Sequence, residues 1–76
     1  MTDFLTHAWL LEKFGPRLGL EQLAEVMRMT RGGISNAISA GHFPIPTYTD
    51  AGRRFADAAD VARHLARCRL AAKVSA

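Results

Sequence analysis

The chain has few of the residues that mark secreted, membrane or disulfide-rich proteins. Its single cysteine, Cys68, excludes an internal disulfide and suits a reducing compartment. The sequence has no run of about 18 or more apolar residues, so no transmembrane helix and no membrane partner are expected. Asp3 and the absence of an early basic stretch argue against a secretory signal. These absences favour the cytoplasm.

Motifs of catalysis and metal binding are also missing. There is no nucleophile elbow, phosphate-binding loop or pair of catalytic carboxylates, and a small core leaves little room for a substrate pocket. His64 and Cys68 are spaced i, i+4, but a zinc site needs two further ligands. We therefore expect no enzyme, no catalytic residue, no metal and no cofactor, and interpret Cys68 as a small buried apolar residue.

What is present is enough for one folded domain over residues 1–76. Hydrophobic residues make up 49% of the chain, which argues against disorder. The net charge is only +3, but its distribution is uneven. Residues 1–27 hold four acids against two bases, whereas residues 28–76 hold eight bases against three acids. The positive half would suit phosphates, although a basic surface kept for solubility is the alternative.

Residues 20–40 carry the pattern of two short helices joined by a turn. The first has apolar residues at i, i+3, i+4 and i+7: Leu20, Leu23, Ala24 and Met27. Thr30 is a good N-cap for a second helix from about Arg31 to Ala40, and Gly41 ends it. Such a pair can place its second helix in the major groove of DNA.

Two more helices are expected to flank this pair. One runs from Thr2 or Asp3 to Phe14, with an apolar face: Phe4, Leu5, Ala8, Trp9 and Leu11. It either covers the core, the commoner outcome in so short a chain, or presents Phe4, Trp9 and Leu10 to a partner. The last helix starts at Asp57, an acid at the N-cap, and has this apolar side: Val61, Leu65, Cys68 and Ala72.

A two-stranded β-hairpin, or wing, is predicted between the helix pair of residues 20–40 and the last helix. Residues 47–49 (Thr-Tyr-Thr) and 53–55 (Arg-Arg-Phe) flank the turn Asp-Ala-Gly. An isolated hairpin is marginal, so we expect Phe55 to anchor it on the helices. The fold class is mostly α, a small α+β domain: a winged helix-turn-helix with flanking N- and C-terminal helices.

The candidate DNA-binding residues follow from the helical wheel and the hairpin. With Ile34, Ala37, Ile38 and Gly41 on the buried side, small polar residues face outward, where Asn can bond an adenine edge and Ser a base or a phosphate. Arg31 could reach a phosphate or a guanine, and Arg53 and Arg54 should have different roles because strand side chains alternate. The predicted set is Thr30, Arg31, Gly32, Ser35, Asn36, Ser39, Thr47, Arg53 and Arg54. Tyr48 is a second hydroxyl candidate, or a core residue.

These segments together resemble the excisionase/MerR-like winged helix-turn-helix family, including the small AlpA-type regulators of prophages and plasmids. The matching parts are residues 20–27 (Leu-Glu-Gln-Leu-Ala-Glu-Val-Met), 29–31 (Met-Thr-Arg), 34–38 (Ile-Ser-Asn-Ala-Ile), 41–46 (Gly-His-Phe-Pro-Ile-Pro), 53–55 and 60–65 (Asp-Val-Ala-Arg-His-Leu). The likeness covers roughly residues 18–66. It departs at Arg28, where the family usually has glycine, so Arg28 is expected in a left-handed conformation at a cost of about 1 kcal/mol. The first helix lies outside the family's minimal core.

The resemblance implies a small protein that binds double-stranded DNA without a catalytic centre or cofactor, associated with the nucleoid. Such proteins are transcriptional regulators or recombination directionality factors of mobile elements. Specificity would then come from repeated sites, a homodimer or cooperative assembly, and a recombinase or polymerase contact stays open. The alternative is a protein-interaction adapter that uses the same fold without DNA, with an exposed apolar patch around Trp9.

Overall fold

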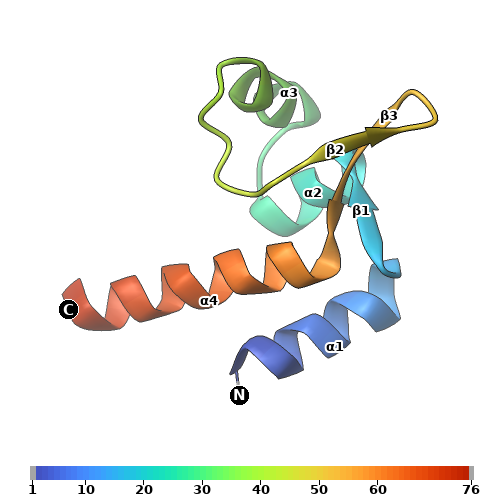
Figure 1. Ribbon diagram of the computed structural model, residues 1–76. Coiled ribbons are helices and arrows are strands. Elements are labelled where there is room, and N and C mark those ends of the chain that lie inside the picture. The colour runs from blue at the N-terminus through green and yellow to red at the C-terminus, as the bar shows by residue number, and fades with distance from the viewer. Residues whose placement is uncertain (1, 76) are drawn as a thin grey trace.

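The chain folds into four helices and three short strands, and the computed structural model describes residues 2–75 and the side chains of residues 4–73. In chain order the elements are α1 (Thr2–Phe14), β1 (Arg17–Gly19), α2 (Leu20–Met27), α3 (Arg31–Ser39), β2 (Tyr48–Asp50), β3 (Arg53–Asp57) and α4 (Ala58–Ser75) (Figure 1). The predicted small, mostly helical α+β fold with a hairpin is confirmed. The last helix begins one residue later than expected, because Asp57 belongs to β3.

The α2–α3 pair has the predicted helix–turn–helix form, and local signals explain both ends of its turn. Arg28 ends α2 in the left-handed conformation (φ 58°, ψ 42°), as the missing glycine predicted. Its N–H and that of Met29 are both directed at the carbonyl of Ala24. Thr30 is the N-cap of α3, and its Oγ1 accepts a 3.0 Å hydrogen bond from the backbone N–H of Gly33.

The three strands form an antiparallel sheet in the order β1-β3-β2. The hairpin is therefore not a free two-stranded wing, and this corrects the prediction: Arg17 pairs with Asp57 and Gly19 with Phe55 on its second edge. A third strand satisfies the backbone groups of β3 on both sides and stabilises a hairpin that would be marginal alone. The pairing spans about 40 residues of sequence, which is why a three-residue strand left no recognisable pattern.

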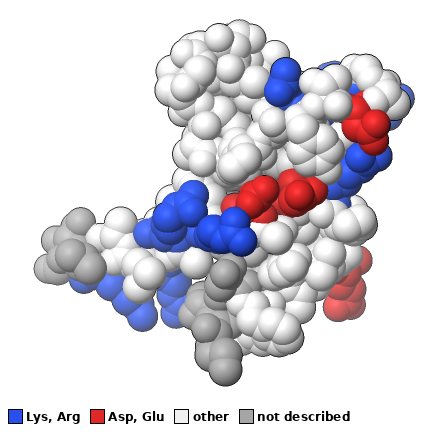
Figure 2. Space-filling model, viewed as in Figure 1, with Lys and Arg blue, Asp and Glu red and all other residues white. Residues whose placement is uncertain are grey.

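Helix α1 docks through one side only, and the expectation that its predicted apolar face covers the core is wrong. Leu10 is fully buried, but Phe4, Leu5, Trp9 and Leu11 are 69%, 67%, 51% and 42% exposed. The visible surface over α1 is accordingly uncharged over most of its area (Figure 2). The physical reason is geometric: the side of α1 that faces α4 and β1 is set by Leu10, about a third of a turn from the stripe that contains Phe4 and Leu11.

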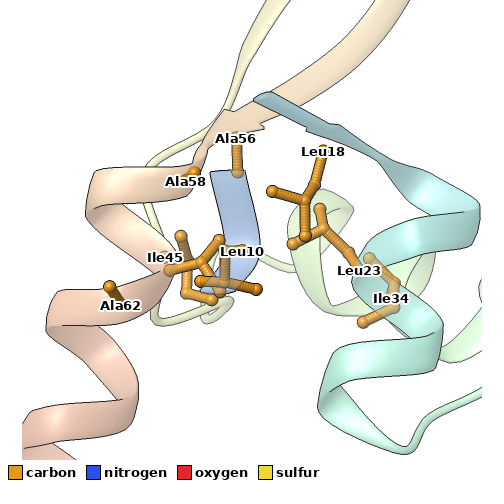
Figure 3. Packing of buried hydrophobic residues seen from close by; sticks show 9 residues of the cluster. Leu10, Leu18, Leu23, Ile34, Ile45, Ala56, Ala58 and Ala62 are labelled. Carbon is orange, nitrogen blue, oxygen red and sulfur yellow. The ribbon is translucent and has the colours of Figure 1, made fainter. Parts of the chain in front are cut away.

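The core gathers one side chain from each of α1, β1, α2, α3 and β3, three from α4, and Ile45 from the loop before β2 (Figure 3). Its fully or almost fully buried members are Leu10, Leu18, Leu23, Ile34, Ile45, Ala56, Ala58, Val61 and Ala62. Three of them are alanines: Ala56 and Ala58 lie at the junction of β3 and α4, and Ala62 lies one turn further along α4. The core thus joins the hairpin, through Ala56, to the helices.

Three further predictions about the core are corrected. Phe55 is only half-buried and does not belong to the core, because the neighbouring Ala56 takes the inward position of β3. Cys68 and Ala72 are exposed rather than buried, since α4 continues beyond the core after Leu65. Gly41 is exposed and lies past the end of α3, with φ 78°.

No helix in residues 2–75 combines the length and apolarity that a membrane crossing requires.

Candidate nucleic-acid interface

Helix α3 has a buried and an exposed side, as its sequence predicts. Ile34 is fully buried and Ala37 nearly so, which ties the helix to the core. On the opposite side the candidate residues Gly32, Ser35, Asn36 and Ser39 are all exposed to solvent. Their small size leaves a low, polar surface with hydrogen-bond donors and acceptors, which is the chemistry that base edges and phosphates accept.

The two glycines at the start of α3 have different roles. A Cβ on Gly33 would lie 3.1 Å from Oγ1 of Thr30, so this glycine accommodates the capping hydrogen bond. A Cβ on Gly32 would meet nothing within 4 Å, and nothing in the fold requires a glycine there. The open space over Gly32 leaves the backbone at the first turn of α3 accessible from outside, next to the exposed side chain of Arg31.

The hairpin arginines point to opposite faces of the sheet, as strand alternation predicts. Arg53 is exposed, on the same face as Phe55 and Asp57. Arg54 is half-buried on the face of Ala56, and its Nη1 donates a 3.1 Å hydrogen bond to Oγ1 of Thr47. Thr47 therefore holds Arg54 in place through its hydroxyl, and the two predicted site residues act as one unit.

A groove of about 680 Å³ separates the start of α2 and α3 from the hairpin. It is lined by Gly19, Leu20, Glu21, Gln22, Arg31, Thr49, Gly52, Arg53, Arg54 and Phe55. All three predicted arginines line the groove, although Arg31 is 22 residues or more from the hairpin arginines in the sequence. Arg53 and Arg54 border it from opposite faces of the hairpin. Glu21 is the one acid in this lining, so the charged groups are three bases against one acid and the groove attracts anions.

Glu21 is an acidic neighbour of Arg31 that the sequence analysis did not single out. Its Oε1 lies 3.7 Å from Nη1 of Arg31, and both side chains are exposed. An exposed ion pair at this distance contributes at most a few tenths of a kcal/mol, so a phosphate could displace Glu21 from Arg31. Gln22 also lines the groove, but its Oε1 already accepts a 2.8 Å hydrogen bond from the N–H of Gly19.

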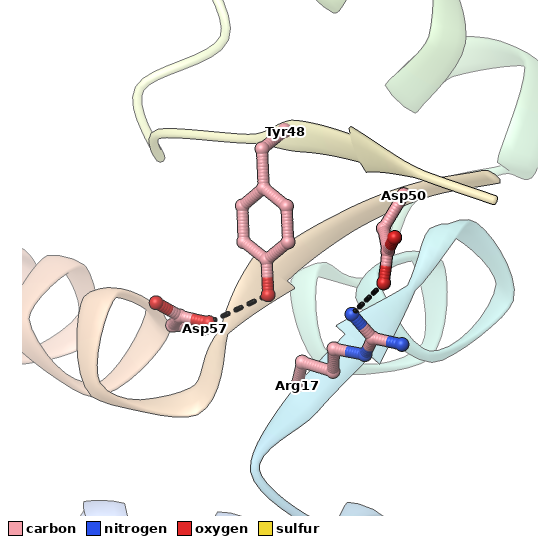
Figure 4. Close-up of polar contacts among 4 residues, drawn as sticks. All are labelled: Arg17, Tyr48, Asp50 and Asp57. Carbon is pink, nitrogen blue, oxygen red and sulfur yellow. Dashed lines mark hydrogen bonds and ion pairs between the residues drawn. The ribbon is translucent and has the colours of Figure 1, made fainter. Parts of the chain in front are cut away.

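The outer face of the sheet carries a polar cluster that the sequence did not reveal (Figure 4). Arg17 of β1 donates a 2.7 Å hydrogen bond to Asp50 of β2, across the central strand. Its guanidinium also lies 4.0 Å from the ring centroid of Phe55, close enough for a cation–π contact. The bond to Asp50 raises the pKa of Arg17 above its ordinary value. The side chain of Arg17 thus links its own strand, β1, to side chains of both other strands.

Tyr48 is engaged in the same cluster and is not a free hydroxyl donor. Its hydroxyl donates a 2.8 Å hydrogen bond to Oδ1 of Asp57. Asp57 was predicted as the N-cap of the last helix. It is instead the last residue of β3, and its carboxylate accepts the hydrogen bond from Tyr48. The N–H of Ala58, at the start of α4, instead donates to the carbonyl of Pro16 at 2.9 Å.

The positive charge of the second half of the chain is divided between two regions. The groove holds Arg31, Arg53 and Arg54, whereas α4 carries Arg63, Arg67, Arg69 and Lys73. Helix α4 runs away from the hairpin, and its C-terminal end lies at the opposite extremity of the molecule (Figure 1). The charge asymmetry of the sequence therefore overstates the charge near α3, because half of those eight bases lie on α4.

His64 and Cys68 are the nearest approach to a metal site. Cys68 Sγ lies 3.5 Å from His64 Nε2 on α4. Burial, helped by the charge of Arg67, lowers the pKa of His64. Among the residues whose positions are described, no group of three or more His, Cys, Asp or Glu side chains gathers at one point.

Comparison of the chain with protein-family models, curated proteins and solved structures gave no match.

Proposed function

We propose that the protein binds double-stranded DNA, with α3 in the major groove and the hairpin along the adjacent backbone. The observation that carries this proposal is the groove between the first turn of α3 and the hairpin, lined by Arg31, Arg53 and Arg54. Helix-turn-helix proteins read bases mainly with the N-terminal residues of the second helix. Here that end of α3 lies across the groove from two hairpin arginines, so one stretch of backbone could contact both.

In this proposal the exposed side of α3 reads sequence. Asn36 is a candidate for a bidentate contact with adenine, and Ser35 and Ser39 for single hydrogen bonds to base edges or phosphates. All three are exposed and have no hydrogen bond to another side chain among the described residues. Gly32 would let the phosphate backbone of DNA approach the first turn of α3, where Thr30 and Arg31 lie.

The hairpin supplies contacts that do not depend on sequence. Arg53 is exposed and would bind a phosphate directly. Arg54 would contribute from a position that Thr47 has already restricted, which lowers the conformational entropy lost on binding. Arg17, through Asp50, would keep the hairpin in the orientation that brings Arg53 to the groove.

The biological role that fits this proposal is a transcriptional regulator or an excisionase-like recombination directionality factor of a mobile element, associated with the nucleoid. The basis is the resemblance of residues 18–66 to the winged helix-turn-helix family and the α2–α3–hairpin order of the fold. The proposal includes no catalytic step, metal or cofactor. A single 76-residue chain contacts few base pairs, so repeated sites or more than one copy would be needed for specificity.

The test is a fluorescence-anisotropy titration against duplex DNA from the region around the protein's own gene and against random duplex, at two salt concentrations. We expect preference for the native region and weaker binding at higher salt, since phosphate contacts release counterions. Arg69→Ala is the matched control for Arg53→Ala, because both arginines are exposed but Arg69 lies on α4. Absence of binding at low salt, or equal losses for these two variants, would reject the proposed interface.

The second candidate function is an adapter that binds another protein and no DNA. It is favoured by one observation, the exposed apolar side chains of α1 around Trp9. In that case the groove arginines would be incidental. A pull-down with the wild-type chain and with Trp9→Ala, combined with the absence of DNA binding at low salt, would favour the adapter over the DNA-binding protein.

A further inference from the structure

Helix α1 is apolar on the side that packs on the domain and again on the side that faces solvent. Phe4, Ala8 and Leu11 are exposed and spaced i, i+4 and i+7, which makes one continuous stripe. Leu5 and Trp9, also exposed, form a second stripe beside it. A helix with apolar residues on opposite sides is typically covered on both, so the outer side of α1 has the composition of an interface.

From this arrangement we infer that α1 forms an antiparallel homodimer with α1 of a second copy of the chain, with the two-fold axis near Ala8. The side chains of the first stripe are large at its two ends, Phe4 and Leu11, and small in the middle, Ala8. Two helices can therefore approach closely where Ala8 of one copy meets Ala8 of the other. With the axis at Ala8, helical geometry places Phe4 of one copy beside Leu11 of the other on one flank of the contact, and Leu5 beside Trp9 on the other flank. The face is therefore complementary to itself, as a two-fold interface requires.

Charge supports the same occupant and orientation. Glu12 is exposed one turn beyond Ala8, and in the antiparallel pairing it reaches the first turn of the other copy's α1. The carboxylate would meet the partial positive charge of the helix N-terminus, which the negative charge of Asp3 in the same turn offsets in part. Lys13 is held away from this position: its Nζ lies 3.3 Å from Glu25 of α2 and within 5.2 Å of the Trp9 ring centroid.

The size of the face sets the expected strength. Aromatic side chains present about 150–250 Å² each, so Phe4, Trp9 and the two leucines of both copies would together bury on the order of 1,000 Å². That is near the lower limit for a specific interface. We therefore expect a reversible dimer that dissociates on dilution. This inference does not depend on the proposed function, although two joined copies would offer two DNA-binding surfaces.

The experiment is sedimentation velocity of the full chain without DNA over a wide concentration range. We expect the mass to rise from 8.3 kDa towards twice that value as concentration increases. Ala8→Glu places two like charges at the closest approach and should weaken the dimer at least about tenfold. Leu70→Glu is the matched control, because Leu70 is an equally exposed apolar residue on α4 and should leave the dimer unchanged.

A second variant and the fluorescence of Trp9 distinguish loss of the dimer from loss of the folded domain. Glu12→Lys keeps the apolar stripe but places a cation at the helix N-terminus of the other copy, and should also weaken the dimer. The single tryptophan, Trp9, should shift its emission to shorter wavelength as the wild-type dimer forms, and not in Ala8→Glu. A wild-type chain of 8.3 kDa at every concentration, or equal dissociation of Ala8→Glu and Leu70→Glu, would overturn the inference and leave the DNA-binding proposal untouched.

Discussion

The hydroxyl of Tyr48 donates a 2.8 Å hydrogen bond to the carboxylate of Asp57, and so joins strand β2 to the last residue of β3. This bond, with smaller help from partial desolvation, raises the pKa of Tyr48, while the nearby Arg17 opposes it. Because the folded state favours the protonated phenol, the bond's contribution to stability is complete below the ordinary tyrosine pKa. It is lost as the pH rises through the higher pKa of the folded protein.

Titration of Tyr48 measures this relationship directly, because the chain has only one tyrosine. We expect the phenolate absorbance to develop at a pH above the ordinary midpoint of about 10. Asp57→Asn removes the negative charge beside the phenol and should bring the midpoint down. Asp60→Asn is the control, since Asp60 pairs with Arg63 and not with the tyrosine. A midpoint that is the same in wild type and Asp57→Asn would show that the carboxylate of Asp57 does not raise the pKa of Tyr48.

The turn between α2 and α3 contains a removable strain. Arg28 has φ 58°, a conformation that disfavours a residue with a Cβ by roughly 1–2 kcal/mol. Arg28→Gly would relieve this strain, but glycine also gives the unfolded chain more conformational entropy, which offsets part of the gain. The substitution should therefore raise the free energy of unfolding by up to about 1 kcal/mol. Arg67→Gly, in the exposed part of α4, should lower it by about 1 kcal/mol. Thermal unfolding of both variants checks the opposite signs.

The N-cap of α3 offers a prediction about stability that is separable from DNA binding. Thr30→Ala removes the acceptor for the N–H of Gly33 and should cost about 1 kcal/mol, a fall in melting temperature of about 4–8 °C for a domain of this size. Thr30→Ser keeps the acceptor and should stay within a few tenths of a kcal/mol of wild type. If alanine and serine were equally stable, the cap would contribute nothing.

The docking of α1 can be tested with two adjacent leucines. Leu10 is fully buried, whereas Leu11 is 42% exposed. Leu10→Ala should therefore destabilise the domain by about 2–5 kcal/mol, the range for a buried leucine. Leu11→Ala should cost well under 1 kcal/mol in the dilute chain. Urea unfolding distinguishes them, and comparable losses would mean that α1 packs through a different side.

On DNA, the helix and the hairpin should differ in kind. Asn36→Ala should reduce the preference for the native duplex while leaving random duplex nearly unaffected, because only a base contact is lost. Arg53→Ala should weaken both duplexes alike and flatten the dependence on salt by about one unit. The anisotropy titration gives both quantities. Equal effects of the two variants on specific and random DNA would contradict the assignment of α3 as the reading helix.

The sequence by itself determined the parts of the fold that local interactions specify. Capping by Thr30 and the inward Ile34 of α3 could be predicted, because each depends on neighbours within one or two helical turns. The hairpin was predictable for the same reason: its turn, Ala51 and Gly52, has positive φ at both positions and lies between two β-prone triplets. Alternation along β3 also separated the two arginines correctly. The left-handed conformation of Arg28 was expected from the resemblance to the winged helix-turn-helix family, which usually has glycine there.

Only the tertiary structure decided what depends on contacts distant in sequence. The pairing of Arg17 with Asp57 created a third strand, and docking on α4 selected Leu10 rather than the more numerous apolar residues of α1. The arginine groove arose in the same way, because Arg31 and Arg53 meet only after the hairpin has packed. Such contacts depend on the arrangement of the whole core, which burial and sterics select together. No periodicity within a single segment records them.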